Sequence, residues 1–242
     1  MKNHTQTARF IGALFLLVNF TFLLGAVGFI EPILSDPDYL NLVHTERNQV
    51  ALGVLLELLN GVAYVGITVM MYPILKVRFQ SIALAYVGFR MIEFVMQVLA
   101  DMSPLSLMSL GEDYVTAGVP DTAAYELAGS MLLADRAWAF EMIAITFGLG
   151  ALCFYIMLYQ SKLVPRFISI WGFIGASAIL AYTVFDLLGF TIPDLGLLML
   201  LNELFLGGWL IVKGFNTAAI NGCKQENTIF VAVDNMQTLK RG

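Results

Sequence analysis

The feature that most constrains this chain is a series of six apolar blocks, most of them about 20 residues long, the length that an α-helix needs to cross a bilayer. The composition agrees, since 59% of the 242 residues are hydrophobic and 13% are charged, whereas soluble domains carry about 25% charged residues. The sequence therefore predicts an all-α integral membrane bundle of six transmembrane helices. The predicted spans are residues 8–30, 48–72, 80–100, 132–159, 165–188 and 195–212, within one domain at 1–215.

Polar segments separate these blocks. Residues 31–47 are predicted to form a loop, and Pro73 is predicted to end the second span, because proline breaks helical hydrogen bonding. Lys76 and Arg78 then form a short basic loop. The apolar run of the first block is about 20 residues long, whereas the apolar core of a signal peptide has roughly 7–15 residues. The length therefore predicts a retained span rather than a cleaved signal peptide.

The longest predicted connection covers residues 101–129, which carry five acidic residues and no basic one. Asp121 follows Pro120 and is predicted to cap a helix. That helical pattern continues towards Gln160, about 58 Å at 1.5 Å per residue, which exceeds a bilayer core of about 30 Å. We expect its first part to be exposed or interfacial, with a bend near Gly129. Residues 216–242 are predicted to be a mobile tail.

Charge bias along the chain predicts the orientation of the spans. The N-terminus, the second and fourth connections and the C-terminal segment hold most of the basic residues, and the first, third and fifth connections are mainly acidic. By the positive-inside rule, both termini are cytoplasmic. An even number of spans agrees, because it places both termini on the same side of the membrane. The basic residues that carry this prediction are Lys2, Arg9, Lys76, Arg78, Lys162, Arg166, Lys213, Lys224, Lys240 and Arg241.

Ionisable residues inside the apolar blocks are the candidate functional groups. Arg90 and Glu93 lie near the middle of the third block, three residues apart, and so share one face of a helix. A charge at a helix centre costs roughly 2.5–3.5 kcal/mol and normally faces a bundle interior or a water-filled cavity. The candidate ligand-binding set is Arg90, Glu93, Arg136, Glu141, Glu57 and Glu203, all predicted at mid-membrane or in the outer half of the bundle.

Two interpretations of this set stay open. The charges can pair and fix which helices are neighbours, at about 0.6–2 kcal/mol for each interhelical contact. They can instead line an outward-opening polar pocket, in which the arginines suit carboxylate or phosphate groups. The carboxylates outnumber the arginines by at least two, so some must be protonated, solvated or paired with a cation. This surplus favours a wet pocket over a dry core of salt bridges.

If the charges line such a pocket, we expect the protein to bind or move a small amphiphile, lipid or anion, with membrane lipids around it. An intramembrane enzyme with a carboxylate base acting on a lipid-like substrate is one alternative. A non-catalytic subunit of a membrane complex is another, favoured by the small size of the chain. No sequence feature selects a reaction, so the identity of the ligand stays open.

Other functional classes lack supporting residues. The sequence has no basic stripe with interleaved aromatic residues, which is the pattern that would predict nucleic-acid binding. Cys153 lies in an apolar block and Cys223 in the tail, and neither spacing predicts a disulfide framework or a metal site. His4 and His44 both lie outside the spans. We therefore predict no metal and no cofactor.

Four short motifs resemble a known family. They are ARFIGALFLL near the start, FR-x-x-E at residues 89–93, PRF-x-x-x-WG at 165–172 and NEL-x-x-x-GWL-x-x-KG at 202–214. Over roughly residues 8–215, the chain resembles the bacterial membrane proteins grouped as domain of unknown function 4386. Arg90, Glu93, Glu203, Trp209 and Lys213 occupy what look like its recurring positions. The resemblance implies a multi-helix membrane protein, which we expect in a bacterial inner membrane, and implies no activity or cofactor.

Overall fold

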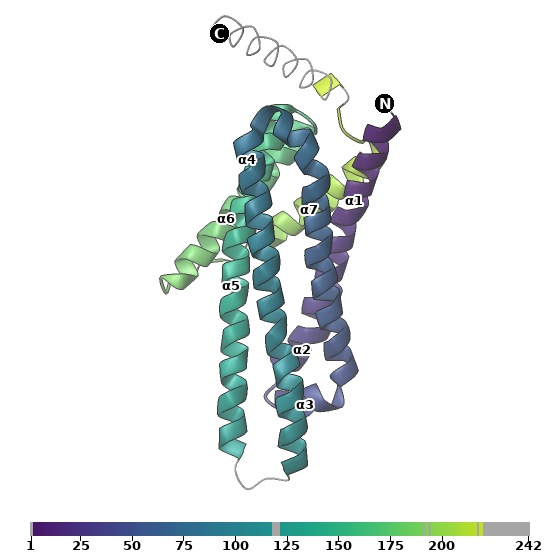
Figure 1. Cartoon of the computed structure of the whole chain (residues 1–242). Coiled ribbons are helices and arrows are strands. Elements are labelled where there is room, and N and C mark those ends of the chain that lie inside the picture. The colour runs from purple at the N-terminus through teal and green to yellow at the C-terminus, as the bar shows by residue number, and fades with distance from the viewer. Residues whose placement is uncertain (1, 118–121, 191, 194, 217, 220–242) are drawn as a thin grey trace, which may run out of the picture.

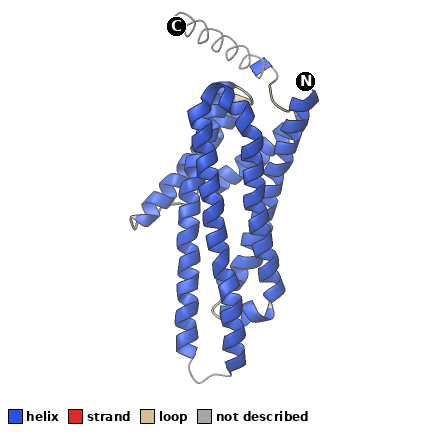
Figure 2. Cartoon of the chain, viewed as in Figure 1, coloured by secondary structure: helices blue, strands red, loops and turns tan. Residues whose placement is uncertain are grey.

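The structure, a computed structural model, describes residues 2–117, 122–190, 192–193, 195–216 and 218–219. The described residues form helices joined by short turns and contain no strand (Figure 2). The elements are α1 (Lys2–Phe22), the π-helix η1 (Leu23–Ile30), α2 (Glu31–Leu34), α3 (Tyr39–Thr45), α4 (Arg47–Ala117), α5 (Thr122–Ser161), α6 (Arg166–Leu187) and α7 (Gly196–Val212). The predicted all-α class is confirmed. The predicted N-cap Asp121 and nearly all of the predicted tail lie outside the described residues.

The break between the second and third predicted spans falls at Phe79, later than predicted. Phe79 has φ −129° and ψ 49°, which are not helical angles, and it divides α4 into residues 47–78 and 80–117. Pro73 lies inside the first half and does not end it, and Lys76 and Arg78 are helical rather than part of a loop. Proline is tolerated within helices of this kind because neighbouring groups can satisfy the freed carbonyl.

In the predicted connection at residues 101–129, the helix expected from Thr122 is found, but the loop expected before it is wrong. α4 continues to Ala117 and α5 begins at Thr122, so the acidic segment is mostly helix. The physical reason is a second apolar core, in which residues from α2, α3 and both halves of α4 pack together. The buried positions Ser103, Pro104, Leu107, Met108 and Gly111 recur at the helical spacing of three to four residues. Of the other acidic residues described in this segment, Glu112, Asp113 and Glu126 are exposed and lie outside that buried stripe.

The loop predicted at residues 31–47 contains the short helices α2 and α3, which cover this second core. In α5, the expected bend at Gly129 is not found as a break, because one helix runs from Thr122 to Ser161. Figure 1 shows α2, α3 and the paired ends of α4 and α5 at one end of the molecule. The N-terminus and the turn that divides α4 into two halves lie at the opposite end.

The long helices contact one another in a closed series: α1 with α4, α4 with α5, α5 with α6, α6 with α7, and α7 with α1. The main apolar core lies among them. The contact of α1 with α7 is close, since a Cβ added to Gly12 would lie 2.6 Å from the carbonyl oxygen of Gly207. Small residues permit this approach, and it brings α1 and α7 to the centre where the candidate site lies.

Among the described residues, length and apolar composition make four helices able to cross a membrane: Thr5–Leu34, Arg47–Ala117, Ala123–Ser161 and Arg166–Leu187. The shorter α7 is also apolar. Many large hydrophobic side chains point outward along these helices, for example Leu197 at 66% and Val212 at 73% exposure. Such a surface fits a membrane-embedded bundle, because lipid tails rather than water would surround it.

Candidate functional site

Arg90 forms an ion pair within its own helix. Its Nη1 donates to both carboxylate oxygens of Glu93, at 2.9 Å each, one helical turn along α4. Both residues are buried, with 3% of Arg90 and 7% of Glu93 exposed. The predicted shared face is therefore correct, and the pair is a contact within a single helix.

Aromatic rings surround the Arg90 guanidinium. Its central carbon lies 4.5 Å from the ring centroid of Tyr64, 4.7 Å from that of Phe147 and 5.7 Å from that of Tyr86. Ring faces attract a cation, and desolvation strengthens this attraction. The Nε atom of Arg90 is buried and has no hydrogen-bond partner. The guanidinium thus keeps one donor that no protein group uses.

Glu203 of α7 lies beside this pair. Its Oε2 accepts hydrogen bonds from the hydroxyl of Tyr64 at 2.7 Å and from Nδ2 of Asn19 at 3.4 Å. Glu203 also interacts electrostatically with Arg90 and Glu93. We call Arg90, Glu93, Glu203, Tyr64 and Asn19 the Arg90 cluster. It joins α1, α4 and α7 and holds two carboxylates against one arginine.

The position of Glu203 is fixed by its neighbour in the sequence. Asn202 is fully buried, accepts a hydrogen bond from the hydroxyl of Tyr155 at 2.6 Å and donates to the carbonyl of Ile168 at 3.0 Å. These bonds connect α7 to α5 and α6. A buried amide that lost these partners would be costly, so the register of α7, and with it the place of Glu203, is set by this network.

A second group of charges, the Arg136 cluster, joins different helices. Arg136 of α5 donates from Nη2 to Oε1 of Glu57 at 2.7 Å, and its Nη1 lies 3.8 Å from Oδ1 of Asp101. The same Nη1 donates to the carbonyl of Ala100 at 3.2 Å. The amide of Gln97 bridges the two carboxylates, at 3.2 Å from Glu57 and 3.0 Å from Asp101. This cluster connects α5 with both halves of α4.

The two clusters lie at different distances from the Phe79 turn. Arg90 follows Phe79 by 11 residues, which corresponds to about 16 Å along a helix. Glu57 and Asp101 each lie 22 residues from Phe79, one before it and one after it, or about 33 Å away. Because both carboxylates are equally far from the turn, the hairpin places them side by side.

The structure brings together five of the six predicted residues, in two groups rather than one. Arg90, Glu93 and Glu203 form the first group, and Arg136 with Glu57 forms the second. Glu141 belongs to neither group. It is half-buried, its Oε2 has no hydrogen-bond partner, and on α6 it faces the charge of Asp186 and the side chain of Thr183.

Sequence analysis missed four polar members of these clusters. Asp101 was assigned to a loop, while Gln97, Tyr64 and Asn19 were not singled out as site residues. Counting outward from the hairpin turn could have paired Asp101 with Glu57, but only with the turn placed at Phe79. In the described part of the chain, no three His, Cys, Asp or Glu residues lie together as a metal site would require.

Fold and clusters together define a class: an all-helical protein whose long apolar helices fit a membrane-embedded bundle, with arginine–carboxylate clusters buried between the helices. The family model for a domain of unknown function (DUF4386) matches residues 10–214, and the chain belongs to that family. The resemblance inferred from the four motifs is therefore confirmed. Comparisons with curated proteins and with solved structures gave no match.

Proposed function

We propose that this chain spans a bacterial inner membrane six times, with both termini in the cytoplasm, and binds or moves a small amphiphile, lipid or anion. Three observations support six spans. Four helices are long and apolar enough to cross, α4 divides at Phe79 into two halves, and α7 is an apolar helix of 17 residues. The basic residues at the Phe79 turn support the orientation.

The depth of Arg90 is the observation that carries the proposed function. At about 16 Å from the basic turn, Arg90 would lie near the middle of a bilayer core about 30 Å thick. An ionised group is most costly there, and such groups mark ligand or ion pathways. The ion pair with Glu93 lies within one turn of α4 and does not hold two helices together. Holding helices together through that ion pair therefore does not explain why ionised groups are buried at this costly depth.

The Arg136 cluster would lie at or beyond the outer membrane boundary, since Glu57 and Asp101 are about 33 Å from the Phe79 turn. Arg136 already contacts Glu57, Asp101 and a backbone carbonyl. We assign it to holding α5 against α4. The outer half of the bundle, where the proposed pocket lies, is the interval between the two clusters.

The chemistry of the Arg90 cluster suggests what it would recognise. The unpartnered Nε of Arg90 is a charged donor suited to a carboxylate, phosphate or other acceptor group. Glu93 and Glu203 together exceed the single arginine by one negative charge when both are ionised. A proton or cation must balance that charge in a dry interior. The cluster therefore suits an acidic amphiphile that binds together with a proton.

Native mass spectrometry tests this proposal. The wild-type protein would be taken from membranes in mild detergent and compared with Arg90→Gln and with Arg47→Gln, which changes an arginine whose side chain is 54% exposed. We expect a discrete bound mass in the wild type and in Arg47→Gln, and its loss in Arg90→Gln. The melting temperature of each variant shows whether it is folded.

Two results would contradict the proposal. The first is a wild-type protein free of any bound mass in several mild detergents and in lipid nanodiscs. The second is a bound mass that a folded Arg90→Gln protein retains at wild-type occupancy. Either result would assign the Arg90 cluster to structure alone.

A further inference from the structure

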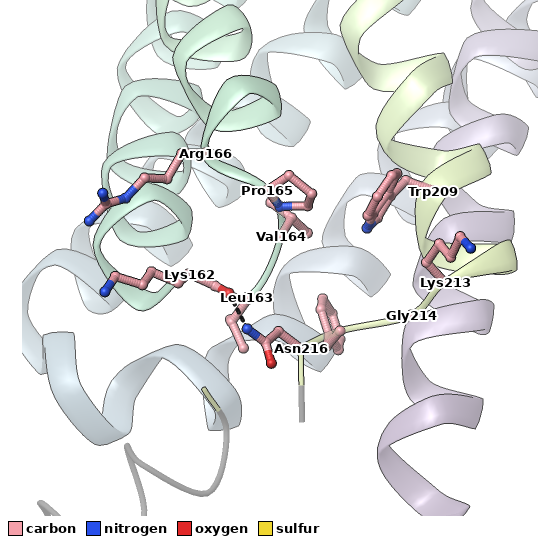
Figure 3. A pocket seen from close by; sticks show the side chains of 10 residues that line it. Lys162, Leu163, Val164, Pro165, Arg166, Trp209, Lys213, Gly214 and Asn216 are labelled. Carbon is pink, nitrogen blue, oxygen red and sulfur yellow. Dashed lines mark hydrogen bonds between the residues drawn. The ribbon is translucent and has the colours of Figure 1, made fainter. Parts of the chain in front are cut away.

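A cavity of about 500 Å³ lies where the turn between α5 and α6 meets the end of α7 (Figure 3). It is at the end of the bundle that carries the basic turns, and it shares no residue with either buried charge cluster, although Trp209 follows Glu203 of the Arg90 cluster by six residues on α7. Lys162, Arg166 and Lys213 line it together with Trp209, and no acidic residue among those that the structure describes does so. The cavity is therefore a positively charged space with one large amphipathic ring in its wall.

Hydrogen bonds hold the two sides of this cavity together. The backbone N–H of Asn216 donates to the carbonyl of Leu163 at 2.9 Å, and its Nδ2 donates to the carbonyl of Lys162 at 3.4 Å. Gly214, at φ 71°, ends α7 in the left-handed region that favours glycine, and turns the chain towards Asn216. The floor is apolar and buried, with Phe215 only 6% exposed. The cavity thus has a built frame.

The three cations have no ion pair within the described part of the chain. In Figure 3, Lys162 and Arg166 extend on one side of the cavity and Lys213 extends on the other. All three side chains are exposed, and Arg166 packs over the ring of Tyr159 at 5.0 Å. The charged ends of Lys162 and Arg166 point away from Lys213 in Figure 3, so these exposed side chains would have to rotate towards the mouth of the cavity to contact one anion there.

An aromatic strip continues from the cavity along α6 and α7. Trp209 contacts Phe167 and Phe205, with ring centroids 6.5 Å and 6.4 Å apart, and Phe205 also contacts Trp171 at 6.1 Å. Phe167 is 52% exposed and Phe205 is 43% exposed. This strip is an apolar surface next to the charged mouth. Tryptophan also favours the level of lipid headgroups.

From these features we propose that the cavity binds a phosphate group, supplied by the headgroup of an anionic phospholipid. The cations contact the phosphate, and one acyl chain lies along the aromatic strip. Basic pockets between membrane helices on the cytoplasmic side bind such headgroups. The site is separate from the Arg90 cluster and does not depend on the ligand proposed for that cluster. A soluble phosphate ester offers the same phosphate chemistry without the acyl chain, so the test must separate the two sources.

The test is a native mass spectrometry titration of the full-length protein in detergent. Phosphatidylglycerol and phosphatidylcholine would be compared on the wild type and on the double variant Arg166→Gln/Lys213→Gln, which leaves the other basic residues to set topology. Lys76→Gln is the matched control, because Lys76 is an exposed cation that packs over Tyr72 at 5.2 Å and lies outside this cavity. Lys213→Gln alone serves if the double variant does not fold.

We expect the wild type and Lys76→Gln to bind phosphatidylglycerol at least about tenfold more tightly than phosphatidylcholine. The double variant should lose on the order of thirtyfold in phosphatidylglycerol affinity, and Lys213→Gln about fivefold. Equal binding of the two lipids, or unchanged binding in a folded double variant, would overturn the proposal and leave these cations as determinants of topology only.

Glycerol 3-phosphate added as a competitor distinguishes the sources of the phosphate. Displacement of the lipid only at concentrations far above that of the lipid supports a headgroup site. Displacement at comparable concentration supports the phosphate site but assigns it to a soluble ester. The Arg90→Gln variant should bind phosphatidylglycerol like the wild type, so failure here is separable from failure of the proposed function.

Discussion

The two buried charge clusters share the same charged groups and differ in the helices that their ion pairs connect. Each holds one arginine, two carboxylates and one carboxamide: Asn19 beside Arg90 and Gln97 beside Arg136. In the Arg90 cluster the ion pair lies within one turn of one helix. In the Arg136 cluster, the arginine on α5 contacts two carboxylates from the two halves of α4. Composition alone therefore does not tell structural charges from functional ones.

This difference shows that the role of a buried ion pair depends on whether it lies within one helix or connects two helices. An interhelical pair stabilises one arrangement of helices. Removing one partner leaves the other charge buried without compensation, which lowers the stability of the bundle. An intrahelical pair adds little to helix packing, so its burial calls for another explanation. The environments also differ, because three aromatic rings surround Arg90, whereas Arg136 has a single ring, Phe140, at 4.7 Å.

Arg136→Gln should have the largest effect on stability. The substitution leaves Glu57 and Asp101 buried without a cation, and breaking a buried pair in this way costs about 3–5 kcal/mol. Unfolding in increasing amounts of a denaturing detergent, followed by circular dichroism, measures the free energy. A loss below about 1 kcal/mol would show that Arg136 does not hold the helices together.

A double-mutant cycle with Glu57→Gln sharpens this prediction. If the contact at 2.7 Å is the main one, Arg136→Gln/Glu57→Gln should be more stable than the sum of the two single losses predicts. Recovery should be partial, because Asp101 remains as a second buried carboxylate. Full additivity of the two substitutions would contradict the structural role.

Sequence reasoning worked best where apolar length alone decides. The spans predicted at 165–188 and 195–212 correspond closely to α6 and α7, and the first lies within the helix Thr5–Leu34. It failed at residues 101–129, where charged residues suggested a loop. The buried stripe through Ser103, Leu107 and Gly111 has helical spacing, but its partners on α2 and α3 are known only from the tertiary structure.

The candidate site was predictable as a set of residues and not as a geometry. Charges within apolar blocks identified Arg90, Glu93, Glu57, Arg136 and Glu203. Their partition into two clusters depends on the place of the hairpin turn, and a break assigned to Pro73 shifts the register of the second half of α4. Uncharged partners such as Tyr64 carry no signal in a single sequence, because tyrosine is common in apolar helices.

Tyr64→Phe should cost less than Arg136→Gln. The substitution removes the hydroxyl that donates to Glu203 at 2.7 Å and leaves the longer bond from Asn19 at 3.4 Å. A buried acceptor that loses its partner costs about 1–3 kcal/mol. The same detergent unfolding experiment measures this loss, and Tyr72→Phe, at a tyrosine outside both clusters, is a matched control. Equal stability of both variants would indicate that Glu203 finds another donor.

Arg90→Lys should have a smaller effect on stability and a clear effect on binding. Lysine keeps the charge but lacks the planar guanidinium that packs against Tyr64 and Phe147 at 4.5 Å and 4.7 Å. Loss of the guanidinium–ring contacts should cost on the order of 0.5–2 kcal/mol. Occupancy of the proposed ligand in native mass spectra should fall further than stability does. Normal occupancy in Arg90→Lys would show that charge alone is recognised.

Arg47→Gln should have the smallest effect and provides the scale for the others. Arg47 and Glu112 form an ion pair at 2.8 Å, as short as those in the buried clusters, and it also joins the two halves of α4. Their side chains are 54% and 56% exposed, so water screens the pair and its removal should change stability by about 0–1 kcal/mol. If Arg47→Gln proved as costly as Arg136→Gln, connection between helices would decide the cost and burial would not. The expected gap between these two interhelical pairs isolates burial. The expected difference in stability loss between Arg136→Gln and Arg90→Lys has two sources. One is whether the arginine connects two helices, and the other is whether its positive charge is kept.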